Sequence, residues 1–372
     1  MPPLTILIKP ASSLCNMRCK YCFYHDVAEN RNIKSYGIMS RDTLEILVKK
    51  TLAYADKACT FAFQGGEPTL AGLGFFQELT GLEKKYNIKK IQVSNTIQTN
   101  GTMIDEEYAE FFGRNHFLVG LSLDGGRELH DGLRVDAEGK GTFDRVLNAA
   151  RLFDKYHVEY NILCVVNNFV ARHGSQVYHF FKKNNFRYLQ FIQCLDGFDN
   201  RTGDYSLTPE RYTAFLKSTF DNYYNDFMRG DYTSIRMFDN YIGMIAGNPA
   251  ECCGMNGVCT CNFVVEGDGS VFPCDFYVLD RYRLGNIREN SFEEMRGGDT
   301  AKRFIEESES MDPKCGECKW LNICKGGCRR CREPFTGGRP SLNMFCESYY
   351  AFFEYAWERM RKMAMELRQS AT

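Results

Sequence analysis

Three cysteines lie close together near the start of the chain, in the spacing C-x3-C-x2-C: Cys15, Cys19 and Cys22. Iron–sulfur clusters with four irons normally take four thiolates. Three thiolates in so short a loop can hold three irons and leave one coordination position open, and an open metal position is what catalysis requires. A zinc knuckle completed by His25 is the alternative, although zinc loops favour paired C-x2-C spacing.

A second group of cysteines lies between residues 252 and 346 and contains eleven of the seventeen in the chain. Iron–sulfur clusters would account for this group, and so would two zinc sites in a ribbon-like module, since the C-x2-C pair at Cys315 and Cys318 fits zinc by itself. From Glu251 to Phe345 the sequence consists of Gly- and Cys-rich loops without helical or strand periodicity. We therefore expect this region to need bound metal in place of a conventional core.

The charge balance speaks against a nucleic-acid-binding protein, and the length of the apolar runs speaks against a membrane-spanning one. Forty-six basic and 47 acidic residues give a formal net charge of -1, without the basic excess of nucleic-acid-binding proteins. No apolar run reaches the ~18 residues of a membrane span, and the N-terminal MPPLTILIKPASS lacks the layout of a signal peptide. We therefore expect a cytoplasmic protein with no nucleic-acid or membrane partner. Cytoplasmic thiols stay reduced, so the cysteines indicate metal ligation, not disulfides.

Alternating strand-like and helix-like patterns over the first ~200 residues predict consecutive βα units that would position the first cysteine loop. The strands are too apolar for a solvated face, which indicates a parallel sheet covered by helices. Six units are too few for a closed eight-unit barrel, so we expect an α/β fold: a partial (β/α)6 TIM barrel, open, with its active face at the strand C-termini. The predicted strands are Leu4–Lys9, Cys59–Phe63, Ile91–Thr96, Phe117–Leu123, Glu159–Val166 and Tyr188–Gln193.

The helices between these strands follow from apolar stripes and capping residues. Ser40 is a good N-cap for the first of them, and Thr208-Pro209 opens a long helix whose aromatic stripe we interpret as core. We place the barrel in residues 1–230 and a Cys-rich auxiliary domain with a C-terminal helix in residues 231–372. The remaining predicted helices are Phe75–Tyr86, Asp105–Arg114, Thr142–Tyr156, Ala171–Asn184 and Tyr349–Leu367.

The C-x3-C-x2-C loop, with the aromatic Tyr21 before its last cysteine, resembles that of the radical S-adenosylmethionine (SAM) superfamily. This resemblance implies a [4Fe-4S] cluster whose open iron is chelated by the amino and carboxylate groups of SAM. An electron from the reduced cluster would then cleave the sulfonium to a 5′-deoxyadenosyl radical. The resemblance extends along the barrel to Gly65-Gly66-Glu67-Pro68, which follows the second predicted strand and matches the family's GGEP element.

The same resemblance implies which residues bind SAM. Gly66 lets the backbone approach the SAM amino group closely, and Glu67 can accept a hydrogen bond from it. A guanidinium suits a carboxylate, so the SAM carboxylate would lie against Arg134 and Ser122. The candidates for the adenine are the Tyr21 backbone and Leu195, and Gln64 points into the same face by its position.

The second cysteine group matches the seven-cysteine SPASM pattern of peptide-modifying radical SAM enzymes, and Cys253 supplies an eighth thiolate. Eight thiolates ligate two further [4Fe-4S] clusters, which makes three in all. Of the cysteines left over, those inside predicted strands fit as small core residues: Cys59, Cys164 and Cys194. Single-residue misassignment is possible among Cys252, Cys261 and Cys331, which neighbour ligands. By resemblance, the first auxiliary cluster takes Cys253, Cys259, Cys274 and Cys328, and the second takes Cys315, Cys318, Cys324 and Cys346.

Five stretches over the whole chain resemble the anaerobic sulfatase-maturating enzymes: CNMRCKYCFYHD, FAFQGGEPTL, QTNGT, DFYVLD and CKGGCRRC. That family oxidises the β-carbon of a cysteine or serine in a sulfatase polypeptide to Cα-formylglycine, in a C/S-x-P-x-R-like context. The resemblance thus implies a sulfatase as partner and, by analogy, a ferredoxin or flavodoxin as electron donor. Neither the residue type of the target nor the oligomeric state follows from the sequence.

The resemblance also assigns a general base. Asp275, next to Cys274, would take the substrate proton after the radical removes a β-hydrogen, and the auxiliary clusters would take the remaining electron. Flanking Phe272, Phe276 and Tyr277 would desolvate Asp275 and raise its pKa. Two alternatives stay open: a maturase that forms thioether or other crosslinks in a ribosomal peptide, and a non-catalytic zinc or electron-transfer protein. The near-zero net charge speaks against a tRNA-modifying enzyme.

Overall fold

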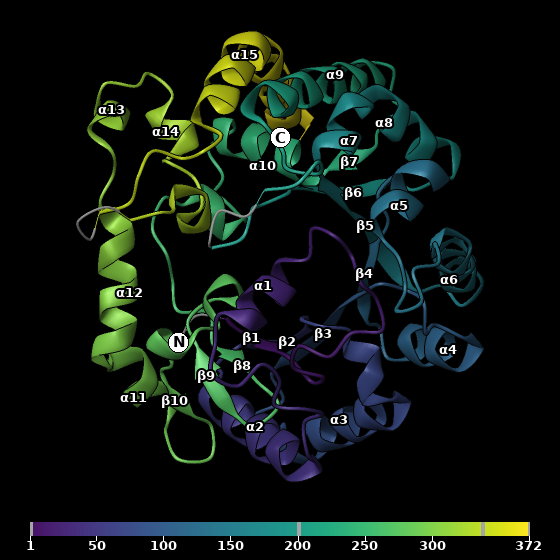
Figure 1. Ribbon diagram of the computed structural model, residues 1–372, viewed down its shortest axis with the longest axis vertical. Helices are drawn as coiled ribbons and strands as arrows, with labels where there is room; N and C mark the ends of the chain where they lie inside the picture. Colours follow the sequence, from purple (N-terminus) through teal and green to yellow (C-terminus); the bar gives the residue numbers. More distant parts are fainter. Residues whose placement is uncertain (1–2, 199–201, 336–338, 371–372) are drawn as a thin grey trace. The chain divides into compact units, whose positions relative to one another are not determined.

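The computed structural model describes residues 3–198, 202–335 and 339–370. The chain forms two compact units, each assembled from separate stretches of sequence (Figure 1). The first contains Met1–Leu123, Asp131–Asn161 and Cys261–Phe304, and the second contains Asp124–His130, Ile162–Thr260 and Ile305–Thr372. Three elements have residues in both units: α5 (Arg127–Leu133), β5 (Glu159–Val166) and α12 (Asp299–Glu309).

A sheet with β1 in its interior forms the centre of the first unit. In chain order β1 to β4 pair parallel to one another, with Leu4 opposite Cys59 and Ile8 opposite Phe63. On its other side β1 pairs parallel with β8, and β9 and β10 follow antiparallel. The strands are β1 (Leu4–Ile8), β2 (Ala58–Phe63), β3 (Gln92–Thr99), β4 (Leu118–Ser122), β8 (Val264–Val265), β9 (Ser270–Phe272) and β10 (Gly285–Asn286).

Helices cover the strands of the first unit, and α2 and α3 pack against each other beside them (Figure 1). Ser40 caps α2 by accepting from the Thr43 N–H, as the sequence predicts, and Asp105 caps α4 in the same way through the Tyr108 N–H. The helices are α1 (Phe23–Glu29), α2 (Arg41–Tyr54), η1 (Pro68–Ala71), α3 (Leu73–Tyr86), α4 (Glu106–Arg114), α6 (Phe143–Lys155), η3 (Asp275–Tyr277), η4 (Asp280–Tyr282) and α11 (Phe292–Gly297).

The second unit combines a short parallel sheet with a packed group of helices. β6 pairs parallel with β5 and with β7, and α9 packs against α7, α8 and α15. Thr208 caps α9, and the aromatic stripe of that helix is buried in the core, as predicted. The elements are α7 (Asn168–Arg172), α8 (Gly174–Lys183), β6 (Tyr188–Gln193), α9 (Pro209–Met228), β7 (Ser234–Ile235), α10 (Arg236–Ile245), η2 (Cys253–Met255), α13 (Pro313–Gly316), α14 (Leu321–Cys324), η5 (Arg329–Arg332) and α15 (Cys346–Ser370).

All six predicted parallel strands are present, but two other expectations are wrong. The helix predicted over Ala171–Asn184 is two helices, α7 and α8, separated at His173. The region from Glu251 to Phe345 is not only loops, because residues 264–309 contribute β8, β9, β10, α11 and α12 with a buried apolar core. Strands of two or three residues are too short to show an alternating pattern. The division of domains at residue 230 stays a prediction.

No helix in the described part of the chain is both long and apolar enough to cross a membrane.

Candidate active site and cysteine clusters

The loop that carries Cys15, Cys19 and Cys22 directly follows β1 and is fixed by its backbone. The Arg18 N–H donates to the Val135 carbonyl at 2.7 Å, and the Lys20 N–H donates to the Leu133 carbonyl at 3.1 Å. Burial, with smaller contributions from the charges of Glu67, Cys22 and Cys19, raises the pKa of the Cys15 thiol to about 12. Thiolates crowded in this way are stabilised by a bound cation, which displaces their protons. The donor set therefore fits the predicted cluster.

The GGEP turn lies directly against this loop. Gly66 has a positive φ of 56°, and a side-chain carbon at this position would lie only 2.2 Å from the Leu14 carbonyl oxygen. The next residue, Glu67, donates its backbone N–H to the same oxygen at 2.8 Å. Because only glycine has both the conformation and the size for this contact, Gly66 sets the distance between the turn and the cysteine loop.

The Glu67 carboxylate is buried, with 1% of the residue exposed, and it ties the GGEP turn to the end of β3. Its Oε1 accepts from the Thr69 N–H and hydroxyl at 3.1 and 2.6 Å and from the Thr99 hydroxyl at 2.7 Å. Oε2 accepts from the Asn100 N–H at 2.7 Å. The four donors give Glu67 a structural role, and Oε2 retains capacity for the predicted contact with the SAM amino group.

The residues after β3 hold the cysteine loop from a second side. The Asn100 side-chain amide donates to Asn16 Oδ1 at 2.9 Å and lies 3.9 Å from the Cys15 sulfur. Asn16 in turn donates to the Thr102 hydroxyl at 2.9 Å. The sequence contains the signal for this contact, the QTNGT stretch, but the resemblance assigns no role to it. Asn100 and Asn16 are therefore site residues that sequence reasoning missed.

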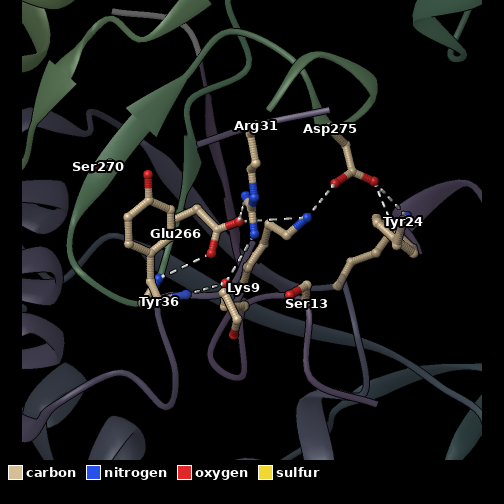
Figure 2. Close-up of polar contacts among 12 residues, drawn as sticks. Lys9, Ser13, Tyr24, Arg31, Tyr36, Glu266, Ser270 and Asp275 are labelled. Carbon is tan, nitrogen blue, oxygen red and sulfur yellow. Dashed lines mark hydrogen bonds and ion pairs between the residues drawn. The ribbon is translucent and has the colours of Figure 1, made fainter. Parts of the chain in front are cut away.

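Asp275 lies in η3, where its carboxylate is packed among polar side chains (Figure 2). The Tyr24 hydroxyl donates to Oδ2 at 2.6 Å, and the Gln64 side-chain amide donates to Oδ2 at 3.2 Å. Oδ1 is buried and accepts no hydrogen bond from the described residues, and the Lys9 ammonium lies 3.8 Å from it. Burial raises the pKa of Asp275, as predicted, and Lys9 opposes this shift. Gln64 thus contacts the predicted base.

Tyr24 connects Asp275 with the cysteine loop. It lies two residues beyond Cys22, whose charge acts on it, and burial together with Asp275 raises its pKa well above the usual value. α1 packs against η3, and the rings of Phe23 and Phe276 lie 4.8 Å apart between centroids. The loop and the carboxylate are thus held together in one unit. Tyr24 lies in the CNMRCKYCFYHD stretch, but the resemblance assigned no role to it, and no sequence pattern pointed to Lys9.

Of the other SAM candidates, Ser122 and Arg134 are buried, whereas Tyr21 and Leu195 are half-buried. Ser122, the last residue of β4, accepts a hydrogen bond from the Gln98 side-chain amide at 3.2 Å. The Arg134 guanidinium lies 5.5 Å from the centre of the Tyr21 ring, which brings two of the predicted contacts together in the first unit. Leu195 lies two residues beyond β6, in the second unit.

Four thiols of the second unit are close enough to influence one another: Cys315, Cys318, Cys324 and Cys346. Burial, together with the charges of Cys346, Cys315 and Cys318, raises the pKa of Cys324 to about 11. These are the four residues that the resemblance gives to one auxiliary cluster.

The thiols predicted for the other auxiliary cluster are divided between the units. Cys253, Cys259 and Cys328 lie in the second, where desolvation together with the charges of Cys328 and Cys259 raises the pKa of Cys253 to about 11. Cys274 belongs to the first. Cys331 hydrogen-bonds Cys328. The cysteines predicted as core residues are buried: Cys59, Cys164 and Cys194.

No three His, Cys, Asp or Glu side chains of the described ranges come close enough together to hold a single metal ion. His25, which would complete a zinc knuckle, is exposed on α1. A four-iron cluster places its thiolates on separate iron atoms and so keeps them farther apart than one tetrahedral ion does.

Two family models match the chain. Residues 10–174 match the Radical SAM superfamily, and residues 253–319 match an iron-sulfur cluster-binding domain, SPASM. The cysteine-type anaerobic sulfatase-maturating enzyme of Clostridium perfringens is 52% identical over 370 residues, which cover 99% of this chain and 100% of the relative. The chain belongs to the anaerobic sulfatase-maturating enzyme family. The predicted fold, family and enzyme class are confirmed, as are iron–sulfur clusters and SAM as cofactors.

Relatives within this family differ in type and in similarity. The serine-type enzyme of Bacteroides thetaiotaomicron is 32% identical, with 98% of this chain and 92% of the relative covered. A solved structure of native anSMEcpe with bound AdoMet and Cp18Cys peptide superimposes with a TM-score of 0.95 at 51% identity, covering 98% of this chain and 100% of that one.

The SPASM match ends before Cys324, so three of the predicted auxiliary ligands follow it in sequence: Cys324, Cys328 and Cys346.

Proposed function

We propose that this chain oxidises a cysteine of a sulfatase polypeptide to Cα-formylglycine under anaerobic conditions. The observation that carries the proposal is the link, through Tyr24, between the three-cysteine loop and the Asp275 carboxylate, whose buried Oδ1 accepts no hydrogen bond from the described residues. The preference for cysteine over serine is supported by 52% identity to a cysteine-type relative against 32% to a serine-type one.

Each step of the proposed oxidation can be assigned to residues of the site. Cys15, Cys19 and Cys22 would hold the first cluster, which with SAM would supply a 5′-deoxyadenosyl radical for removal of a β-hydrogen from the substrate cysteine. We assign to Asp275 the thiol proton, which Oδ1 accepts, while Tyr24 and Gln64 hold Oδ2. One electron also leaves the substrate, and we assign its uptake to the auxiliary clusters. The resulting thioaldehyde reacts with water to give the aldehyde and sulfide.

The same proposal assigns the cofactor ligands. Gly66 and Glu67 face the SAM amino group, Ser122 and Arg134 its carboxylate, and Tyr21 and Leu195 its adenine. The positive φ of Gly66 and the burial of Arg134 support the first two assignments. The first cluster takes Cys15, Cys19 and Cys22, and the auxiliary clusters take Cys253, Cys259, Cys274 and Cys328, and Cys315, Cys318, Cys324 and Cys346.

The electron donor, the cellular location and the partners can be proposed from redox chemistry and charge. We propose a ferredoxin or flavodoxin as electron donor, because cleavage of SAM needs a low-potential electron. No cysteine of the described residues forms a disulfide, which supports a reducing, cytoplasmic location. A formal net charge of -1 supports the proposal that the protein has no nucleic-acid partner. We also propose that it does not act at a membrane.

The test uses the anaerobically reconstituted protein with SAM, dithionite and a synthetic sulfatase peptide that carries Cys in a Cys-x-Pro-x-Arg context. Mass spectrometry of the peptide is expected to show formylglycine in place of the cysteine, and the amount of formylglycine is expected to rise together with the amount of 5′-deoxyadenosine. The matched peptide with serine at that position is expected to react more slowly. An internal crosslink in place of the aldehyde would indicate a peptide-crosslinking maturase, and an unchanged peptide with no 5′-deoxyadenosine would contradict radical chemistry altogether.

A further inference from the structure

A buried lysine, Lys9, lies beside Asp275. Lys9 is 2% exposed, and its ammonium nitrogen lies 3.8 Å from Oδ1 of Asp275 and 3.9 Å from Oε1 of Glu266 (Figure 2). A buried cation needs opposite charge nearby, and the two carboxylates supply it. Both separations exceed hydrogen-bond length. The ammonium therefore attracts the Asp275 carboxylate without occupying its free oxygen.

The Lys9 side chain has little freedom to move. Its backbone N–H donates to the Val265 carbonyl at 2.9 Å, which fixes the residue between β1 and β8. Its alkyl chain passes so close to Gly65 that a side-chain carbon there would lie 2.6 Å from Lys9 Cε. The ammonium also lies 4.7 Å from the centre of the Tyr24 ring, within the range of a cation–π contact.

A second cation fixes Glu266 on the far side of Lys9. Arg31 Nη1 lies 2.6 Å from Glu266 Oε1, and both side chains are buried. Arg31 Nη2 also donates to the Ser12 hydroxyl at 3.3 Å and to the Lys34 carbonyl at 2.8 Å. The charges thus alternate from Arg31 through Glu266 and Lys9 to Asp275 (Figure 2). Without the Lys9 charge, Glu266 would keep Arg31 as a partner, whereas the Asp275 carboxylate would lose the ammonium that lies 3.8 Å from its Oδ1.

We propose that Lys9 is a positioning residue for the Asp275 carboxylate. Tyr24 and Gln64 hold Oδ2 by hydrogen bonds, while Lys9 attracts Oδ1 from a distance. Together they stop the carboxylate from rotating about its Cβ–Cγ bond and leave Oδ1 able to accept a proton. The effect on the reaction rests on the proposed function, whereas the effect on the orientation of Asp275 does not.

The kinetic test compares Lys9→Met, which keeps the alkyl chain but not the charge, with Lys9→Arg, which keeps the charge. The matched control is Lys85→Met, at an exposed ion pair with Glu45. The readout is aldehyde formed per 5′-deoxyadenosine. We expect Lys9→Met to lower this ratio by about 10- to 100-fold, Lys9→Arg to retain a ratio closer to that of the parent, and the control to match the parent.

A purely structural role for Lys9 would lower cluster content and both products together and leave the ratio at the parental value. That result, or equal ratios in Lys9→Met and Lys9→Arg, would overturn the proposal. Crystal structures of the parent and Lys9→Met give a readout that needs no activity. We expect the Asp275 carboxylate to rotate and lose its Tyr24 contact in the variant, and an unmoved carboxylate would overturn the inference. If the parent makes no aldehyde, the proposed function fails, while these structures still decide the role of Lys9.

Discussion

The two oxygens of the Asp275 carboxylate have different surroundings. Oδ2 accepts hydrogen bonds from Tyr24 and Gln64, whereas Oδ1 accepts none from the part of the chain that the structure describes. A hydrogen bond to the charged form makes an oxygen a weaker proton acceptor. The asymmetry therefore directs an incoming proton to Oδ1.

Asp275→Asn removes the proton acceptor but keeps the shape of the side chain. We expect aldehyde formation to fall by roughly 10²- to 10⁴-fold, the usual contribution of a general base, while cleavage of SAM continues. Peptide mass spectrometry and chromatography of 5′-deoxyadenosine measure the two products in one reaction. Aldehyde formation at the parental rate would contradict the assignment of the base.

Gly66→Ala introduces a methyl group 2.2 Å from the Leu14 carbonyl oxygen at a position with positive φ. We expect the turn to move away from the cysteine loop, so that the spectral change of the reduced cluster on addition of SAM is weakened or lost. Electron paramagnetic resonance of the reduced protein measures this change. Gly74→Ala is the matched control, because the space around Gly74 in α3 is open and alanine favours a helix.

Local spacing explains which site residues could be predicted. The candidates Cys15, Cys19 and Cys22 and the run from Cys315 to Cys328 follow from intervals of two to five residues, which are visible in the sequence. The longer spacings of Cys253, Cys259, Cys274 and Cys346 were assigned by the resemblance to the SPASM pattern. Lys9 and Glu266 lie far apart along the chain and meet only because β1 pairs with β8. A buried lysine or glutamate has no local signature that separates it from an exposed one, so this part of the site required the structure.

At the scale of elements, the contact between α3 and β3 contains a buried acid. Glu83 of α3 accepts a hydrogen bond from the Asn95 side-chain amide at 3.2 Å through Oε2, while its buried Oε1 accepts none from the described residues. Burial raises the pKa of Glu83 to about 7. Its ionised form is therefore disfavoured in the folded state.

Since the folded-state pKa of Glu83 lies above the unfolded one, the stability that it contributes is greatest at low pH and is lost as the pH rises through about 7. We expect the parent to lose about 1 kcal/mol between pH 6 and pH 8 from this group, and Glu83→Gln to remove that dependence. Thermal unfolding at the two pH values measures it. Glu78→Gln, at a surface ion pair on the same helix, should keep the parental difference; a Glu83→Gln variant that does so too would contradict the expectation.

The accuracy of the predicted elements depended on their length. The strands of five or more residues show their period, as in β5, and α2 shows its cap at Ser40, whereas α12 was missed although it has eleven residues. β8, β9 and β10 have two or three residues each and sit among glycines, so their pairing partners decide their conformation. The break between α7 and α8 was missed because the apolar stripe continues across His173.

At the scale of the whole molecule, the thiol count predicts the metal content. The eleven cysteines that we propose as ligands of three four-iron clusters imply about twelve irons per chain. We expect Cys324→Ala to lose about four of these and to unfold more readily, since the surrounding loops depend on the cluster. Cys59→Ala, in the core of β2, should keep the full count. Iron analysis after anaerobic purification measures both, and an unchanged count in Cys324→Ala would exclude it as a ligand.

The placement of β1 has a consequence for biosynthesis. Its neighbour β8 begins at Val264, so during translation one edge of β1 stays without its partner until most of the chain has left the ribosome. Unpaired strand edges are sites of aggregation. Nascent chains that stall before residue 264 should therefore need a chaperone to stay dispersed, and those that stall beyond the C-terminal end of β10, at Asn286, should need it less.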